Sequence, residues 1–272
     1  MQYNPPSKIV FPHIVTAGGW ETDISLVNMD SVSSTILLTF YSESGSPMDV
    51  TMKPSSMDGL SGDNGHGCYT QFSGDTATGS AFCISMFSGG SFQAKLTSTG
   101  DVERDGWARI SYTAMDDTIG GYETFRRLGT NGLPDFEASV PLSYTGDWEF
   151  CVPFDNRDGF VTAMAMVNPT TNGQTTAQSI NVRVAILNSF GALTSTGSIQ
   201  LAIGEHRAFI VNDLFPQTRD TYGVLFFRAQ TGENTLGGSL SALGLRFNPK
   251  GAFATIPILN YYTMYNGVHF PN

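Results

Sequence analysis

The sequence predicts an all-β protein made of two tandem antiparallel β-sandwich domains that are related by an internal duplication. Three observations lead to this prediction. A repeat spans most of the chain, short segments alternate apolar and polar residues, and no long stretch has helical periodicity. Many short strands separated by turn residues are typical of sandwiches rather than of β-α-β units.

The internal repeat divides the chain into two similar halves. Residues 19–28 (GWETDISLVN) reappear as residues 159–168 (GFVTAMAMVN) at an offset of 140. Two further matches follow in the same order, residues 90–94 with 204–208 at an offset of 114 and residues 106–128 with 223–245 at an offset of 117. The repeat predicts one sandwich domain over residues 1–142, a second over residues 143–259, and a tail of residues 260–272. Each domain is long enough to bury its own core.

Two kinds of strand are expected between the turns. Residues 23–26 (DISL) and 181–186 (NVRVAI) alternate polar and apolar side chains, which predicts strands with one buried and one exposed face. More continuous apolar segments predict more fully buried strands at residues 34–41, 81–87, 107–114 and 223–230. Turns are expected at Asn131-Gly132 and at Ser44-Gly45-Ser46, because glycine and asparagine adopt the backbone angles that tight turns require.

Helical structure is expected in one place only. A single helical turn is predicted just before Pro216, capped by Asn212 or Asp213. The connection between the domains, residues 143–149, is short and contains Trp148. A short connection predicts two closely joined domains with limited hinge motion.

The first half carries an insertion over about residues 50–82. Gly45 and Gly90 are 45 positions apart, whereas the matching Gly191 and Gly204 are 13 positions apart, so the first half has 32 extra residues. The insertion departs from the compact form of the second half.

The three cysteines fall at informative positions. Cys68 lies inside the insertion and Cys83 lies near its end. A disulfide between them would close a loop of 15 residues and would stabilise the fold by roughly 3 kcal/mol. We expect this disulfide in preference to two reduced, buried thiols. Cys151 replaces Val10 of the first half, so we expect it to fill an apolar strand position as a small hydrophobic side chain.

Composition limits the classes of partner. The 272 residues include 14 Lys and Arg against 24 Asp and Glu, for a net charge of −10. This balance argues against nucleic acid and against anionic membranes as partners. No apolar run approaches the ~18 residues of a transmembrane helix. Residues 1–7 have no signal-peptide features, so an exported form would have lost its signal or would carry it outside this sequence. The alternative is a cytoplasmic protein that needs no signal. The low charge and the abundant Ser, Thr, Gly and Asn favour an extracellular or cell-surface protein.

No catalytic motif is present, and the chain is expected not to be an enzyme. The sequence contains no nucleophile elbow, no phosphate-binding glycine loop and no histidine pair at metal-ligand spacing. The four histidines are His13, His66, His206 and His269. No catalytic residue and no required cofactor is therefore assigned.

Calcium is a weaker alternative at one turn. Residues 155–159 (DNRDG) place the oxygens of Asp155 and Asp158 around a turn, and calcium prefers such ligands. Asp and Asn also form turns through their own backbone, and this ordinary structural role is favoured over a metal site.

The aromatic residues offer core and surface interpretations. Trp20 and Trp107 occupy positions that other apolar residues take in the second half, so core packing is expected for both. Trp148, Tyr261 and Tyr262 are freer candidates for a surface or an interface.

The tail resembles the start of a third repeat. Residues 141–156 align without gaps with residues 257–272 at an offset of 116, with four identical positions. The tail either packs on its own domain, which is favoured, or pairs with the open sheet edge of another copy. Head-to-tail pairing of this kind would generate a filament. The candidate assembly residues are apolar and lie near the two termini: Ile9, Val10, Phe11, Tyr261, Tyr262, Val268 and Phe270.

The repeat also resembles a known kind of module. The segments FPHIVTAGGWETDISLVN, PDFEASVP, VPFDNRDGFVTAMAMVNP and GLRFNPKGAFATIP are similar to repeated β-sandwich modules of secreted and surface proteins from environmental bacteria. The resemblance covers most of both halves. It implies an extracellular β protein and carries no catalytic residues with it.

Together these observations predict a non-enzymatic structural or adhesive protein of the cell exterior. We expect it to form a homo-oligomer or a polymer, as the subunit of a surface filament assembled head-to-tail by β-strand addition. The alternative is a carbohydrate-binding module of a secreted protein, for which exposed coplanar aromatic rings and a glycan partner are required.

Overall fold

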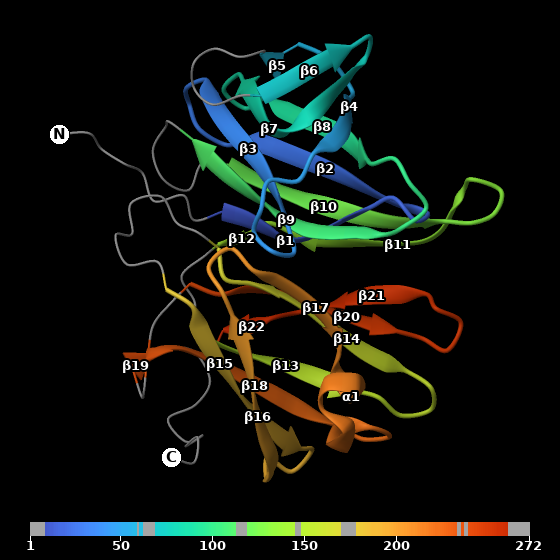
Figure 1. The fold of residues 1–272 in the computed structure, drawn as a ribbon, viewed down its shortest axis with the longest axis vertical. Coiled ribbons are helices and arrows are strands. Elements are labelled where there is room, and N and C mark those ends of the chain that lie inside the picture. Colours follow the sequence, from blue (N-terminus) through green and yellow to red (C-terminus); the bar gives the residue numbers. More distant parts are fainter. Residues whose placement is uncertain are drawn as a thin grey trace.

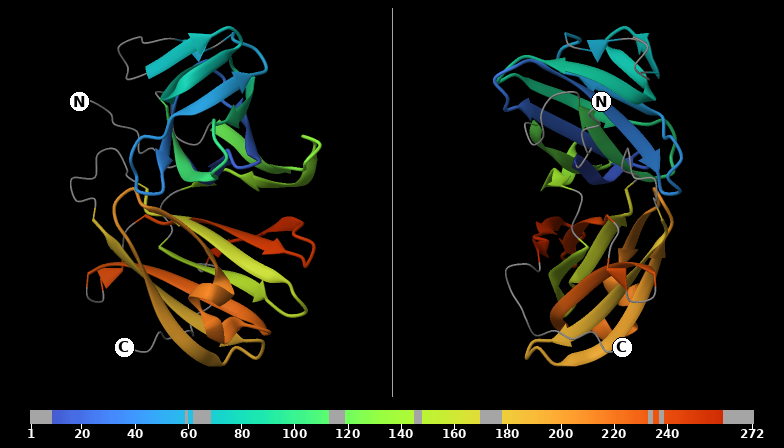
Figure 2. Two further views of the ribbon diagram at one scale, coloured as in Figure 1. Left: turned by 45° about the vertical axis from the view of Figure 1, so that its right-hand side comes forward. Right: turned by 90° about the vertical axis from the view of Figure 1, so that its left-hand side faces the viewer.

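The computed structural model describes residues 9–58, 60–61, 69–112, 119–144, 148–169, 178–232, 235–236 and 239–260. Among them, every recorded strand pair is antiparallel, and the predicted all-β class is confirmed. The strands form two stacked groups, one from each half of the chain (Figure 1), and the turned views show the same two tiers (Figure 2). No described helix is long and apolar enough to cross a membrane.

The first half forms one strongly curved sheet of twelve strands, in which β4 and β7 connect two sets of strands. The strands are β1 (Ile9–Thr16), β2 (Trp20–Asn28), β3 (Ser34–Ser42), β4 (Val50–Pro54), β5 (Leu60–Ser61), β6 (Tyr69–Ser73), β7 (Thr76–Met86), β8 (Ser91–Thr97), β9 (Arg104–Tyr112), β10 (Ile119–Leu128), β11 (Pro134–Pro141) and β12 (Ser143–Tyr144). The predicted insertion corresponds to β4, β5, β6 and the beginning of β7.

The second half forms two separate sheets that pack face to face. The strands are β13 (Glu149–Asp155), β14 (Val161–Val167), β15 (Ile180–Asn188), β16 (Leu193–Leu201), β17 (His206–Ile210), β18 (Tyr222–Gly232), β19 (Thr235–Leu236), β20 (Ser241–Phe247), β21 (Phe253–Ile256) and β22 (Leu259–Asn260). One sheet has the order β16-β15-β18-β13-β22, with β19 beside β18, and the other has the order β17-β14-β20-β21.

The two halves share the same order of strand pairing. The series β3-β9-β1-β12 corresponds to β15-β18-β13-β22, and β8-β2-β10-β11 corresponds to β17-β14-β20-β21. The start of the tail follows the same rule, because β22 pairs with β13 as β12 pairs with β1. Leu259 and Asn260 therefore pair within their own half. Residues 261–272 lie outside the described part of the chain, so the placement of the tail stays a prediction. Common descent of the halves and the domain limits themselves stay predictions of the sequence.

A buried asparagine recurs at the same place in each half. The Asn28 side chain donates to three carbonyl oxygens that include that of Met86, and the Asn168 side chain donates to three that include that of Leu201. Each asparagine supplies amide hydrogens to carbonyls where strands of the two sets end, and buried carbonyl groups require such partners. Asn28 and Asn168 are related by the offset of 140 seen in the sequence.

The predicted offset of 117 is wrong for one strand pair. Leu26 lies opposite Gly121, and the matching Met166 lies opposite Ala242, so β10 and β20 correspond at an offset of 121. In the sequence, Gly120-Gly121 matches Gly237-Gly238 at an offset of 117. That alignment differs by four residues from the correspondence that the strand pairing shows. Pairing with a neighbouring strand defines correspondence more directly than a shared glycine pair does.

The expected helical turn is present, but its cap is not. Helix α1 (Val211–Leu214) is followed by the short 3-10 helix η1 (Pro216–Thr218). The residue that precedes α1 is Ile210, and no side chain caps the helix, so the prediction of a cap by Asn212 or Asp213 is wrong. The first residue of the helix, Val211, is buried against the core of the second half.

Cys151 is a free, buried thiol, as expected from its match to Val10. Burial raises the pKa of this thiol, so it stays protonated near neutral pH. We predict that Cys151→Val, which restores the side chain of the other half, changes the free energy of unfolding by less than about 1.5 kcal/mol. Urea denaturation of both proteins would measure this change, and a larger loss would show that the thiol has a role beyond filling space.

Candidate functional site

The two halves meet in a hydrophobic core of their own. The four-stranded sheet of the second half is buried on both faces, because Met164 and Met166 face the core of their own half while Ala165 faces the first half. We call the shared cluster the interdomain core; its buried members are Val15, Phe125, Val140, Ala165, Leu243 and Phe253. Strands β1 and β11 contribute most of the first-half side, against β14, β20 and β21 (Figure 1). A contact of this hydrophobic character restricts relative motion of domains.

A second contact joins the halves through backbone atoms. Gly45, in the turn after β3, approaches Gly204 so closely that a β-carbon on Gly45 would lie 2.8 Å from the Gly204 carbonyl oxygen. The same carbonyl accepts a hydrogen bond of 2.9 Å from the indole Nε1 of Trp107. The amide of His206 donates to the carbonyl of Glu43 at 2.8 Å. The turn of the first half is therefore held directly against the β16–β17 turn of the second.

Two histidines stack across the same contact. Nδ1 of His13 and Nε2 of His206 are 3.1 Å apart, and the ring centroids are 5.1 Å apart. Burial lowers the pKa of His13 to about 4, and burial together with the nearby His13 lowers the pKa of His206 well below its usual value. Both rings are therefore neutral at pH 7, and one ring donates to the other.

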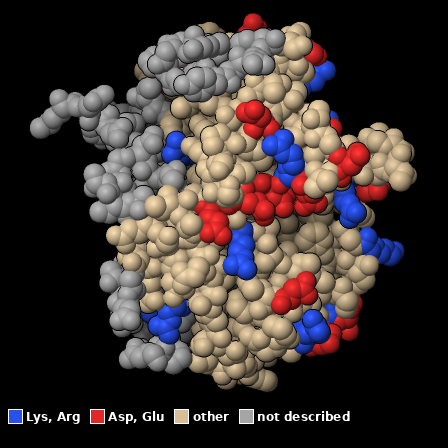
Figure 3. Space-filling view, in the orientation of Figure 1, with Lys and Arg blue, Asp and Glu red and all other residues tan. Residues whose placement is uncertain are grey.

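A pocket of about 470 Å³ opens beside this histidine pair, between the two halves. Most of its lining is apolar, and the polar side chains that line it are His13, Glu103 and Asp105. Burial raises the pKa of Asp105 to about 7, and the carboxylates of Glu103 and Glu43 act in the same direction. Acidic side chains gather on the front face at the level where the two tiers meet (Figure 3).

Glu123 is a further buried carboxyl group that the sequence did not single out. It lies on β10, opposite Ile24 and Val140, and neither carboxyl oxygen has a hydrogen-bond partner among the described residues. Burial raises the pKa of Glu123 well above its usual value, because a carboxylate loses its hydration there.

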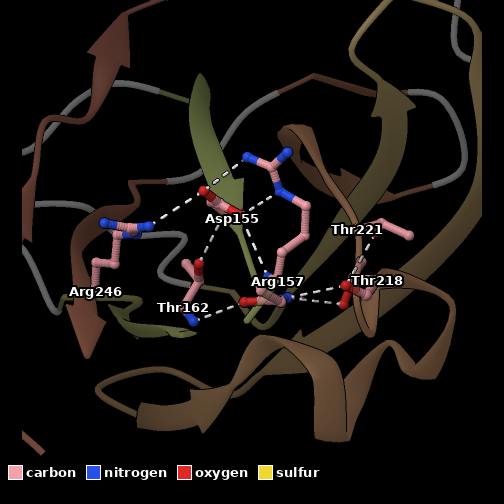
Figure 4. Close-up of polar contacts among 7 residues, drawn as sticks. Asp155, Arg157, Thr162, Thr218, Thr221 and Arg246 are labelled. Atoms are coloured by element: carbon pink, nitrogen blue, oxygen red, sulfur yellow. Dashed lines mark hydrogen bonds and ion pairs between the residues drawn. The ribbon is translucent and has the colours of Figure 1, made fainter. Parts of the chain in front are cut away.

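At the turn of residues 155–159, the alternative position for calcium, an aspartate is paired with two arginines (Figure 4). The Asp155 carboxylate is paired with Arg157 at 2.9 Å and with Arg246 at 3.1 Å. These partners lower the pKa of Asp155 to about 2, with the Arg157 hydrogen bond as the largest cause. A calcium ion at this carboxylate would lie beside two guanidinium groups. Asp158 adopts a left-handed turn conformation, with a φ of 55°, and among the described residues no group of three or more candidate ligands could hold a metal ion.

The candidate assembly residues of the N-terminus are already used within their own sheet. Ile9, Val10 and Phe11 are fully buried in β1, which lies between β9 and β12. Strand addition through these residues would require β1 to leave that sheet. The other candidates, Tyr261, Tyr262, Val268 and Phe270, lie outside the described residues. Assembly through either terminus stays a prediction.

The predicted disulfide between Cys68 and Cys83 is not tested by the structure. Cys68 lies outside the described residues, so its bond with Cys83 stays a prediction.

Trp107 is fully buried, as expected, but in a cluster shared by the two halves rather than in a sandwich core. Trp20 is half-buried beside the interdomain core and lines the pocket. Trp148 packs against the core of the second half.

The interdomain contact could have been found by comparing the outer faces of matched strands. Glu21 and Asp23 on β2 correspond, at the offset of 140, to Val161 and Ala163 on β14. The outward face is thus charged in the first half and apolar in the second, which is the pattern of a strand buried on both sides. The pairing of His13 with His206 had no such signal, because the two are 193 positions apart.

Comparisons with known proteins do not show a family for this chain. No family model matches the chain, and no curated protein matches it. Among solved structures, the pilus adhesin SpaC from Lactobacillus rhamnosus GG is similar at 8% sequence identity and a TM-score of 0.18. The similarity covers 85% of this chain and 26% of that chain. A TM-score this low carries no argument about function.

Proposed function

We propose that the chain is a non-catalytic structural protein of the cell exterior in which two β-sandwiches act as one rigid unit. The interdomain core is the observation that supports this proposal. A sheet whose two faces are both buried cannot turn away from the first half without exposing Ala165, Leu243 and Phe253 to water. A rigid two-domain unit suits a protein that transmits load or sets a spacing.

The exposed aromatic rings give no support to the glycan-binding alternative. Among the described residues, the most exposed rings, Phe87 and Phe190, lie in turns of different halves, and Tyr122 and Tyr222 lie on different strands. No ring contact joins any two of these four in the described part of the chain. A sugar-stacking platform requires such rings side by side.

We further propose that copies assemble by strand addition, with β16 as the receiving edge. The edge strand β11 contains Pro134, Pro141, Asp135 and Glu137, all features that protect an edge. By contrast, β16 is nine residues long (LTSTGSIQL), ends its sheet, and contains no charged residue and no proline. The sequence offers residues 261–272 as the donor segment.

Light scattering of the full chain over a range of concentrations tests assembly. We expect an oligomer or polymer, and we expect a protein that ends at Asn260 to be a folded monomer, because the described pairing of β22 with β13 is kept. A full chain that stays monomeric at high concentration would contradict the proposed assembly. Oligomers of unchanged size after the truncation would contradict the role of the tail.

Two lysines on β16 test the receiving edge separately. Ser198 and Gln200 are exposed on β16, and we expect Ser198→Lys with Gln200→Lys to abolish assembly, because charged side chains block edge pairing. The matched control places the same pair on a central strand, as Ser91→Lys with Gln93→Lys on β8, where both residues are exposed. Light scattering should show monomers for the β16 variant and wild-type assembly for the control. Equal assembly of both variants would exclude β16.

A further inference from the structure

The pocket between the halves is lined mainly by apolar and aromatic side chains. Aromatic rings line it from both sides, with Trp20 and Phe125 from the first half and Phe209, Phe247 and Phe253 from the second. Its volume of about 470 Å³ lies within the range that is typical of small-molecule sites. An apolar pocket of this size favours an organic ligand, because removing the apolar surface of the ligand from water is favourable.

Three carboxyl groups gather beside the pocket. Glu103 and Asp105 line the pocket, and Glu43 is close enough to shift the titration of Asp105. Among the described residues, no ion pair joins any of these three carboxylates to a Lys, Arg or His side chain. One carboxylate oxygen of Asp105, Oδ1, is buried and has no hydrogen-bond partner in the described part of the protein. A positive group in this position would remove the mutual repulsion of the carboxylates.

A neutral polar group completes the lining. His13 is about nine-tenths buried and lines the pocket, and its Nδ1 is within hydrogen-bond distance of His206. Because the ring is uncharged near neutral pH, it does not repel a cation.

We propose that this pocket binds an organic cation whose ammonium group is carried on an apolar or aromatic body. The ammonium group donates hydrogen bonds to Asp105, and the apolar body packs among the rings of the two halves. Aromatic faces attract cations as well, so the walls and the carboxylate favour the same ligand. This binding site is independent of the proposed structural role, since it requires no assembly.

A metal ion fits the site less well. No group of three or more His, Cys, Asp or Glu side chains among the described residues has the geometry to hold a metal. The greater part of the lining also consists of carbon atoms, which contribute nothing to metal coordination.

Calorimetric titration with 4-phenylbutylammonium, and with the neutral 4-phenylbutan-1-ol as its matched probe, tests the proposal. At ~pH 8 the cation should bind about tenfold more tightly than the alcohol, or better, because only the cation forms charge-assisted hydrogen bonds with Asp105. The preference should shrink at ~pH 5, where Asp105 is protonated. Equal affinities for the two probes at both pH values, or no binding of either probe, would overturn the proposal.

Four variants locate the binding. Asp105→Asn should remove the preference for the cation, whereas Asp75→Asn, the same change at an exposed turn of the first half, should leave it unchanged. Ala163→Phe fills the pocket and should abolish binding of both probes. If Ala163→Phe does not fold, as judged by circular dichroism, Ala208→Phe fills the pocket from an exposed position on β17. Binding that persists in a folded pocket-filling variant would place the ligand elsewhere and overturn the assignment.

Discussion

Replacing Gly45 with alanine is expected to destabilise the protein considerably more than the same replacement at Gly191. The two glycines occupy corresponding turns, and both have left-handed backbone angles, with φ of 81° and 77°. Alanine in that conformation costs roughly 1–2 kcal/mol at either position. At Gly45 the new β-carbon would also lie 2.8 Å from the Gly204 carbonyl oxygen, whereas at Gly191 no atom lies within 4 Å. We expect a further loss of roughly 1–3 kcal/mol at Gly45, because the two backbones must move apart.

Gly191→Ala is the matched control, since it reports the backbone cost without the interdomain contact. Urea denaturation of both variants and of the wild type gives the difference directly. The hydrogen bond from Trp107 to Gly204 should weaken in the Gly45 variant alone, which a shift in the indole N–H resonance of Trp107 would reveal. Equal destabilisation by the two substitutions would mean that the turn does not hold the halves together.

Acidification is expected to weaken the folded protein through the pair of histidines. His13 has a pKa of about 4 in the folded state, against 6.5 for an exposed histidine. Between these values the unfolded chain binds a proton that the folded chain does not, so the free energy of unfolding falls as the pH falls. The full loss from His13 is about 3 kcal/mol, complete near pH 4. His206 acts in the same direction, because its pKa is also lowered.

The variant His13→Gln isolates this contribution. Its unfolding free energy, relative to that of the wild type, should rise as the pH is lowered from 6.5 to about 4. Other buried acids, such as Asp105, titrate in both proteins, so their contributions cancel in the difference. A difference that does not change with pH would show that His13 is not buried as a neutral group.

Glu123→Gln is a control for which the pH dependence of the unfolding free energy should have the opposite sign. The pKa of Glu123 is raised in the folded protein, so its contribution to stability is lost as the pH rises above 4.5, the ordinary pKa of an exposed glutamate. The Gln variant should therefore gain stability relative to the wild type as the pH rises above about 4.5, whereas the relative stability of His13→Gln falls as the pH rises from about 4 to 6.5. The same denaturation series measures both effects.

Much of the strand architecture could be predicted from local signals. The expected strand at residues 34–41 is β3 (Ser34–Ser42), and that at 223–230 is β18 (Tyr222–Gly232). Apolar alternation and turn residues act over a few positions, so a single sequence contains them. The turn at Asn131-Gly132 formed for the same reason, with Gly132 at a φ of 73°.

The candidate site was hidden because it depends on contacts between distant segments. Asp105 and Glu123 look like ordinary strand residues in the sequence, and their burial follows only from the packing of the second half and of β11. The calcium alternative shows the opposite case. The oxygen-rich turn was visible in the sequence, but Arg246, 91 positions from Asp155, is brought beside it by the sheet.

The sequence by itself determined that the chain forms antiparallel strands in two similarly ordered halves, because the alternation of side chains and the conformational needs of glycine turns are local properties. Only the tertiary structure decided how the halves meet. It placed Trp107 against Gly204, 97 positions away, and His13 against His206, 193 positions away. Those contacts form when the apolar outer face of β14 is removed from water. The free energy gained by this burial depends on how closely the two assembled surfaces fit together. A short segment of sequence does not contain that information.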